Sequence, residues 1–315
     1  MTDYRLRTLA AGFFAVALAG SVLTGCKRGA SNNTFDNGVD SLTWCTVSFE
    51  DSVSVLDASA YQQMAADFPI DVDTALMDAG TRAAIEWVAN TLQNCSYPDY
   101  DGSGSAAKLM PVPAMDEAEL ETFVARCGRI GLDSMKADMR EMAEDGFGGS
   151  YLNNIKIELT EQTPSYLTLT FGHEVYTGGA HGGWITNGAT FNRATGEQMG
   201  WNLFDMSKEQ ELRAMLIRGV KSYFNDFSEE KIETDEQLYE LLILYDDPET
   251  PENEITIGLP FPQAEPYVTR DGISFVYQQY EIAAYACGLP SFIVPVEEVK
   301  DLLSEKGKEL LGISK

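Results

Sequence analysis

The sequence predicts an α+β protein in which a mixed or antiparallel sheet packs against helices, in two coupled subdomains. Strand-like stretches are rich in Thr, Tyr, Phe and Val, as in Pro164–Tyr176. Helix-like stretches carry apolar residues at helical spacing, as in Thr74–Leu92 and Asp116–Asp145. These stretches do not alternate as regular βαβ units, and this favours α+β over a doubly wound fold.

The N-terminal half is predicted to contain a strand region, two helices and further strands. Asp116 with Glu119 three residues later is a helix-start signal, whereas Gly128 and Gly131 predict an interruption of the same helix. The predicted elements are a strand region at Thr43–Leu56, helices at Thr74–Leu92 and Asp116–Asp145, and strands from Asn154–Leu159 onward.

The C-terminal half is predicted to begin with helices and to end with a hairpin, a strand and a helix. Ser207 with Gln210, and Thr234 with Gln237, have the spacing of capping boxes. The predicted elements are helices at 208–225 and from Thr234 to about Leu244, a hairpin at Tyr267–Ile282 turning at Asp271-Gly272, a strand at Ser291–Val296 and a final helix at Glu297–Leu311.

A glycine-rich loop joins two predicted strands in the middle of the chain. The strand ending at Tyr176 is followed by Gly178-Gly179 and Gly182-Gly183, and a second strand runs from Trp184 to Asn192. Glycine adopts positive φ without steric penalty, so at least one glycine of the first pair is expected there. A turn at Ala194–Gly196 then leads to a third, short strand.

The N-terminus has the pattern of a lipoprotein signal. Arg5 and Arg7 precede an apolar run, and Leu23-Thr24-Gly25-Cys26 has the form of a lipobox, in which Cys26 carries the lipid. The apolar run is short for a transmembrane helix. We therefore expect residues 1–25 to be a signal peptide, 26–40 a flexible tether, and the protein to be anchored by its lipid in the cell envelope, at the outer membrane if the cell is Gram-negative.

The charge is strongly acidic. The chain has 22 Lys and Arg against 49 Asp and Glu, a net charge of −27. This argues against nucleic acid as a partner, because phosphates need basic residues, and it favours cationic partners or solubility.

Four cysteines follow Cys26, and thiols outside the cytoplasm can form disulfides. The candidate disulfide is Cys45–Cys95, with Cys45 at the start of a strand and Cys95 in a loop. Cys127 shares an apolar helix face with Phe123 and is assigned to the core.

No metal, cofactor or catalytic constellation is predicted. His173 and His181 with Glu174 would suit zinc chemically, but in a strand Glu174 points away from the face of His173. Asp99–Gly104 begins like a calcium loop, yet its twelfth position is Met110. The chain also lacks a Gly-x-Ser-x-Gly nucleophile motif.

Two motifs resemble the envelope family that contains domain of unknown function 3298. They are YTGGAHG with the strand, turn and LFD that follow it, and FVYQQYEIAAYACGLPSFIVPVEEVKDLL at Phe275–Leu303. The chain has Ala284 where the family pattern has Pro and Cys287 where it has a small residue. The resemblance extends to RsiV-like and PdaC-like proteins, whose N-terminal partner is domain of unknown function 4163.

The resemblance implies an N-terminal α+β domain at 41–195, a C-terminal α+β domain at 196–315, and a wall-associated ligand. That ligand is a glycan or a cationic protein such as a lysozyme, since one RsiV-like relative is a lysozyme receptor. An enzyme or accessory subunit acting on peptidoglycan or another envelope polysaccharide is the alternative. The candidate ligand-binding residues are His181, Trp184, Tyr176, Gly179 and Tyr280.

Overall fold

The computed structural model describes residues 42–70, 72, 77–96, 110–146, 148–228, 230–243 and 258–313, and the backbone of 25–27. The predicted signal sequence up to residue 24, most of the tether and most of the calcium-like segment lie outside these residues. Within them, no helix has the length and apolar character needed to cross a bilayer.

The described residues form a mixed α+β fold, as the sequence predicts. The larger sheet has seven strands in the order β1-β2-β3-β4-β5-β6-β7, and the smaller has the order β10-β9-β8. The strands of the larger sheet are β1 (Gly25–Lys27), β2 (Trp44–Val55), β3 (Ala58–Pro69), β4 (Ser150–Gln162), β5 (Tyr166–Tyr176), β6 (Gly183–Asn192) and β7 (Gln198–Met199). Only the β3–β4 pair is parallel, so this sheet is mixed.

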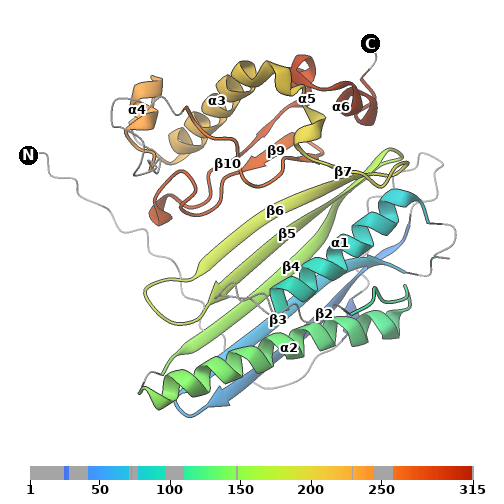
Figure 1. Ribbon diagram of the computed structural model, residues 1–315, viewed down its shortest axis with the longest axis vertical. Coiled ribbons are helices and arrows are strands. Elements are labelled where there is room, and N and C mark those ends of the chain that lie inside the picture. The colour runs from blue at the N-terminus through green and yellow to red at the C-terminus, as the bar shows by residue number, and fades with distance from the viewer. Residues whose placement is uncertain are drawn as a thin grey trace, which may run out of the picture.

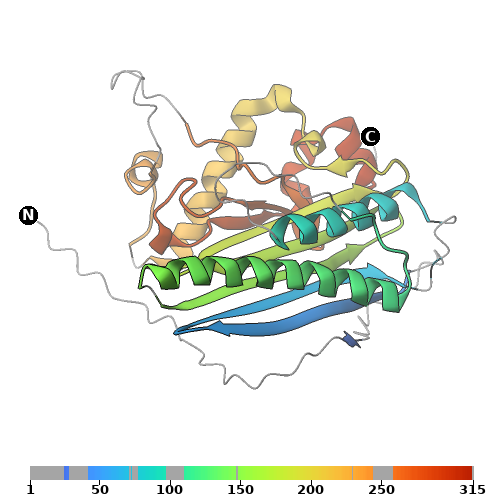
Figure 2. The same cartoon turned by 60° about the horizontal axis from the view of Figure 1, so that its bottom comes forward.

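The helices of the N-terminal part cover one face of the larger sheet (Figure 1). These are α1 (Ala79–Ser96) and α2 (Glu117–Glu144), and Figure 2 shows both lying across the strands on the same side. Alternate residues of β3 and β4 are buried, because successive side chains of a strand point to opposite faces. The face away from α1 and α2 is called the outer face below.

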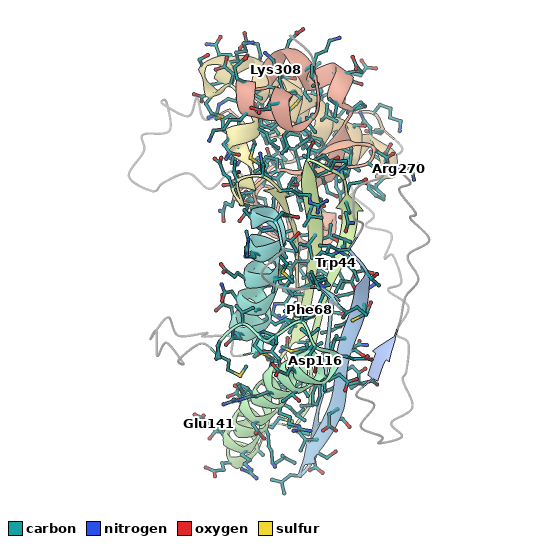
Figure 3. All side chains as sticks on the ribbon, turned by 90° about the vertical axis from the view of Figure 1, so that its right-hand side faces the viewer. Trp44, Phe68, Asp116, Glu141, Arg270 and Lys308 are labelled. Atoms are coloured by element: carbon teal, nitrogen blue, oxygen red, sulfur yellow. The ribbon has the colours of Figure 1, made fainter. Side chains whose placement is uncertain are left out.

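The C-terminal part packs its own helices on the smaller sheet. Its elements are α3 (Glu209–Phe227), α4 (Asp235–Tyr239), β8 (Tyr267–Thr269), β9 (Gly272–Val276), β10 (Ser291–Val294), α5 (Val296–Val299) and α6 (Glu305–Leu310). Figure 3 places Lys308 and Arg270 of this part at the opposite end of the molecule from Glu141 of α2.

The two parts have separate apolar cores. The buried residues between the helices and the larger sheet run up to Phe191, and those of the C-terminal core begin at Met199. The domain boundary at 195/196 remains a prediction. At the joint, the ring of Tyr267 lies over Gly188 of β6, and the Val268 amide donates to the hydroxyl of Thr190.

Helix α2 is continuous, whereas the sequence predicts an interruption at Gly128 and Gly131. Both glycines face the sheet. A Cβ on Gly128 would lie 2.0 Å from the ring of Phe49, and one on Gly131 would lie 2.5 Å from Oε1 of Gln62. The glycines therefore allow close helix–sheet packing and do not break the helix.

Three further expectations differ from the structure. β3 was not predicted. The Ser207–Gln210 capping box does not form, because α3 starts after Lys208 and the Asp205 carboxylate caps a preceding 3₁₀ turn. The final helix is divided into α5, a 3₁₀ turn and α6, where Ser304 caps a new helix start. The Thr234–Gln237 capping box is confirmed.

The structure does not form the candidate Cys45–Cys95 disulfide. Cys45 pairs with Phe68 of β3, whereas the Cys95 carbonyl accepts a hydrogen bond from Asn153, whose strand neighbour on β3 is Gln62. Gln62 and Phe68 are about 20 Å apart along the strand. A disulfide needs Cα atoms within about 7 Å, so the two cysteines are too far apart. Cys95 also lies in the last turn of α1, where a loop was expected.

Candidate functional site

The glycine-rich loop is a tight turn between β5 and β6. Gly178 has φ of 92° and Gly179 has φ of 95°, which confirms the prediction of positive φ. The Tyr176 hydroxyl donates to the Gly179 carbonyl across the turn, 3.0 Å away. The loop thus has a defined shape, and His181, two residues after Gly179, is presented to the C-terminal part.

His181 lies against two tyrosines of the C-terminal part. Its ring stacks on Tyr285, with centroids 3.9 Å apart and planes at 25°. Its Nδ1 is 3.0 Å from the Gly182 carbonyl, and its Nε2 is 3.2 Å from the Tyr280 hydroxyl. A carbonyl can only accept, so in the neutral imidazole Nδ1 donates and Nε2 accepts from Tyr280. His181, Tyr280 and Tyr285 are called the aromatic cluster below.

Tyr280 is held in an unusual backbone conformation. Its φ is 63°, one of two positive values among the described non-glycine residues. Such a conformation costs of order 1–3 kcal/mol, so the surrounding structure must impose it. The Glu281 carboxylate does so in part, because it accepts from the Gln278 amide at 2.7 Å and from the Gln263 amide at 2.7 Å. Tyr280 nevertheless remains 42% exposed.

Trp184 lies on the outer face, and its backbone amide is bonded to Gln279, next to Tyr280 of this cluster. It pairs with Glu174 of β5, so the two side chains share the outer face. A Cβ on Gly172 would lie 3.8 Å from Cζ2 of Trp184, so the indole lies over the backbone of the neighbouring strand. Trp184 is 42% exposed.

Two glutamines of the C-terminal part cap the free edge of β6. The Gln278 side-chain amide donates to the Thr186 carbonyl at 2.7 Å, and its oxygen accepts from the Thr186 amide at 3.3 Å. The Gln279 side chain accepts from the Trp184 amide at 2.9 Å. These bonds replace a neighbouring strand where β7 ends, and they connect the two parts of the molecule.

His173 belongs to the interior and not to the aromatic cluster. It is buried on the helix-facing side of β5, where Nε2 donates to Oδ1 of Asn153 at 2.7 Å. Burial lowers its pKa below the usual value of 6.5. Glu174 lies on the outer face, so the zinc set of His173, His181 and Glu174 is not assembled. The described residues contain no group of three or more His, Cys, Asp or Glu side chains that could hold a metal ion.

Two surface cavities lie in the C-terminal part, away from the aromatic cluster. One, of about 370 Å³, is lined by Gln198, Gly200, Trp201, Asn202 and Glu265. The other, of about 490 Å³, is lined by residues between Ser207 and Arg213. A buried carboxyl group, Glu161, has its pKa raised by burial and by Asp271, against the opposing effect of Arg270. It lines neither cavity, so it does not make either one an active site.

The structure therefore brings together all five candidate residues at the β5–β6 turn and the facing segment. Sequence reasoning missed Tyr285, which lies inside the Phe275–Leu303 motif and was hidden among other aromatic residues. It also missed Gln278 and Gln279, because nothing in their sequence context distinguishes them from exposed polar residues.

Residues 214–297 match the family model described as "Protein of unknown function (DUF3298)". The resemblance to that family is confirmed, whereas the relation to RsiV-like and PdaC-like proteins and to domain 4163 remains a prediction. The matched segment includes Tyr280 and Tyr285 but not the glycine-rich loop.

Two solved structures are similar to the chain. A DUF3298 family member from Bacteroides fragilis superposes with a TM-score of 0.60 at 16% identity, covering 87% of this chain and 98% of its own. A DUF3298 family protein from Pseudomonas aeruginosa PAO1 superposes with a TM-score of 0.50 at 12% identity, covering 84% and 96%. At these identities the likeness concerns the fold alone. No curated protein sequence matches the chain.

Proposed function

We propose that this protein is a lipid-anchored protein of the cell envelope that binds a wall-associated ligand without catalysis. The binding surface would comprise the aromatic cluster with Trp184, Tyr176 and Gly179. One observation carries the proposal: rings from two distant segments of the chain are fixed together at the surface and left partly exposed.

The backbone strain of Tyr280 supports a binding role. A tyrosine that served only to fill space would be expected to bury its ring, and here a strained residue keeps it accessible. Rigid, partly exposed aromatic rings lose little conformational entropy when a ligand stacks on them. Such rings suit the apolar faces of sugars and also cationic side chains.

Both ligand classes, a glycan and a basic protein, are compatible with the aromatic rings and the charge of the molecule. Sugar rings would stack on Trp184 and Tyr280, whereas a basic protein such as a lysozyme would be attracted by the net charge of −27. The salt dependence of the affinity distinguishes the two ligand classes. Binding of a basic protein should weaken as ionic strength rises, because attraction between exposed charges is screened.

The test is a pull-down of the tagged full-length protein, extracted in detergent, against wall fragments and lysozymes. His181→Ala and Trp184→Ala should each weaken capture, and the same samples should be melted. A loss of capture at a nearly unchanged melting temperature supports the binding role. A lowered melting temperature with capture retained would instead mean that His181 only joins the two parts, and no effect on either quantity would remove the loop from the site.

The lipid anchor is tested separately. Cys26→Ala should release the protein from membranes or leave it as an unprocessed precursor, because the lipidated thiol is lost. Unchanged processing and membrane retention, with no lipid label on the wild type, would refute the anchor.

A further inference from the structure

A line of side chains runs along the outer face of the larger sheet from Gln63 of β3 to Trp184 of β6. Beyond Gln63, Glu50 of β2 pairs with Gln63, and the Glu50 carboxylate is hydrogen-bonded to Tyr61. Gln63 of β3 pairs with Asn154 of β4, Asn154 pairs with Glu174 of β5, and Glu174 pairs with Trp184 of β6. Residues paired across neighbouring strands point to the same face, so these four side chains lie side by side. They are called the polar row below, and the row spans about 14 Å.

The polar side chains of the row have donors and acceptors that are free to bind a ligand. Gln63, Asn154 and Glu174 are each half-buried, and within the described part of the chain their side-chain polar atoms have no hydrogen-bond or ion-pair partner. In contrast, Lys156 on the same face is paired with Glu158 at 2.8 Å. The row therefore offers two amides and one carboxylate to a ligand, and the nearby Lys156 already has an ion-pair partner.

The row is bordered by aromatic rings and by the C-terminal part. Tyr61 and Tyr176 flank it in the next row, where both pair with Leu152. On its other side the C-terminal part covers β6, since Tyr267 packs over Gly188 and the Gln278 side chain binds Thr186, whereas Lys156 of β4 remains exposed. Trp184 thus lies at one end of a surface strip that is made of amide, carboxylate and aromatic groups.

We propose that the polar row binds an uncharged oligosaccharide, with a sugar ring stacked on Trp184 and neighbouring hydroxyl or acetamido groups bonded to Glu174, Asn154 and Gln63. Side-chain amides and carboxylates can each meet two such groups, because they offer paired donors and acceptors. A net charge of −27 disfavours a polyanionic glycan. This inference rests on the proposed binding function and names its ligand class and two residues outside the aromatic cluster.

The probe is a β-1,4-linked tetramer of N-acetylglucosamine, titrated calorimetrically into the full-length protein in detergent. Asn154→Ala and Gln63→Ala should each weaken binding roughly fivefold, the loss of about one hydrogen bond. Trp184→Ala should abolish measurable binding. Gln210→Ala, the same change at an exposed position of α3, is the matched control and should have no effect. Melting temperatures should stay within error for the Asn154 and Gln63 variants, since these side chains have no described partner to lose.

Glu174→Gln separates a neutral sugar from a cationic ligand. A glutamine still bonds to hydroxyl groups, so affinity for the tetramer should be retained within a few-fold. If the wild type captures lysozyme but binds no tetramer, and Glu174→Gln weakens that capture tenfold or more, the proposal is overturned in favour of a cationic ligand. If the wild type captures wall fragments but neither Asn154→Ala nor Gln63→Ala affects capture or titration, the polar row is not the ligand site, and the proposed binding function is unaffected. If the wild type captures nothing and binds no tetramer, both the polar-row site and the proposed binding function are refuted.

Discussion

Gly178 and Gly179 determine the shape of the loop at the scale of single residues. Both have positive φ, and no atom lies within 4 Å of their Cβ positions, so any cost of a side chain there comes from the backbone alone. Gly178→Val should lower the free energy of unfolding by roughly 1–3 kcal/mol. Urea denaturation measures it, with Ala180→Val as the control because Ala180 does not have positive φ. Wild-type stability in valine variants of both glycines would refute the tight turn.

His173 makes stability depend on pH. Burial lowers its pKa in the folded state, so between that value and 6.5 the unfolded chain binds more protons. The contribution of neutral His173 to the free energy of unfolding is therefore fully present above pH 6.5 and is lost as the pH falls towards the folded-state pKa. His173→Gln keeps an N–H donor for Asn153 but removes the titration, so its loss of stability between about pH 7.5 and about pH 5 should be smaller than that of the wild type. Equal slopes in wild type and His173→Gln would contradict the prediction.

Helix α2 shows at the element scale how packing outweighs local preference. Gly128→Ala should favour the isolated helix by about 1 kcal/mol. In the protein, the added methyl meets the ring of Phe49 at 2.0 Å, so we expect a net destabilisation of roughly 1–3 kcal/mol from overpacking. Thermal unfolding measures it. The same change in a Phe49→Ala background should be neutral or stabilising, and an equal cost in both backgrounds would show that the contact is not the cause.

The joint between the two parts is the feature to test at the scale of the whole molecule. Gln278→Leu keeps the size of the side chain but leaves the Thr186 amide and carbonyl without their partner. We expect a loss of about 1–3 kcal/mol. Hydrogen exchange at Thr186 should accelerate together with a lower melting temperature. Gln263→Leu is the control, because the side chain of Gln263 is exposed and only its backbone amide is bonded. Unchanged exchange at Thr186 would mean that the glutamine does not hold this edge.

The sequence by itself determined the fold class, most helices and strands, the glycine turn and the DUF3298 resemblance. Periodicity, capping residues and glycine pairs act over a few neighbouring residues, so they can be read from a single chain. The Thr234–Gln237 capping box and the turn at Gly178-Gly179 are examples.

Only the tertiary structure decided which distant residues meet. It kept α2 continuous by packing Gly128 against Phe49, separated Cys45 from Cys95 along β3, and buried His173 while leaving His181 at the surface. It also placed Tyr285 on His181, and Asn154 beside Glu174 and Gln63. The physical reason is that strand register and the joint between the two parts depend on contacts between residues far apart in the chain, and local sequence patterns do not encode these contacts.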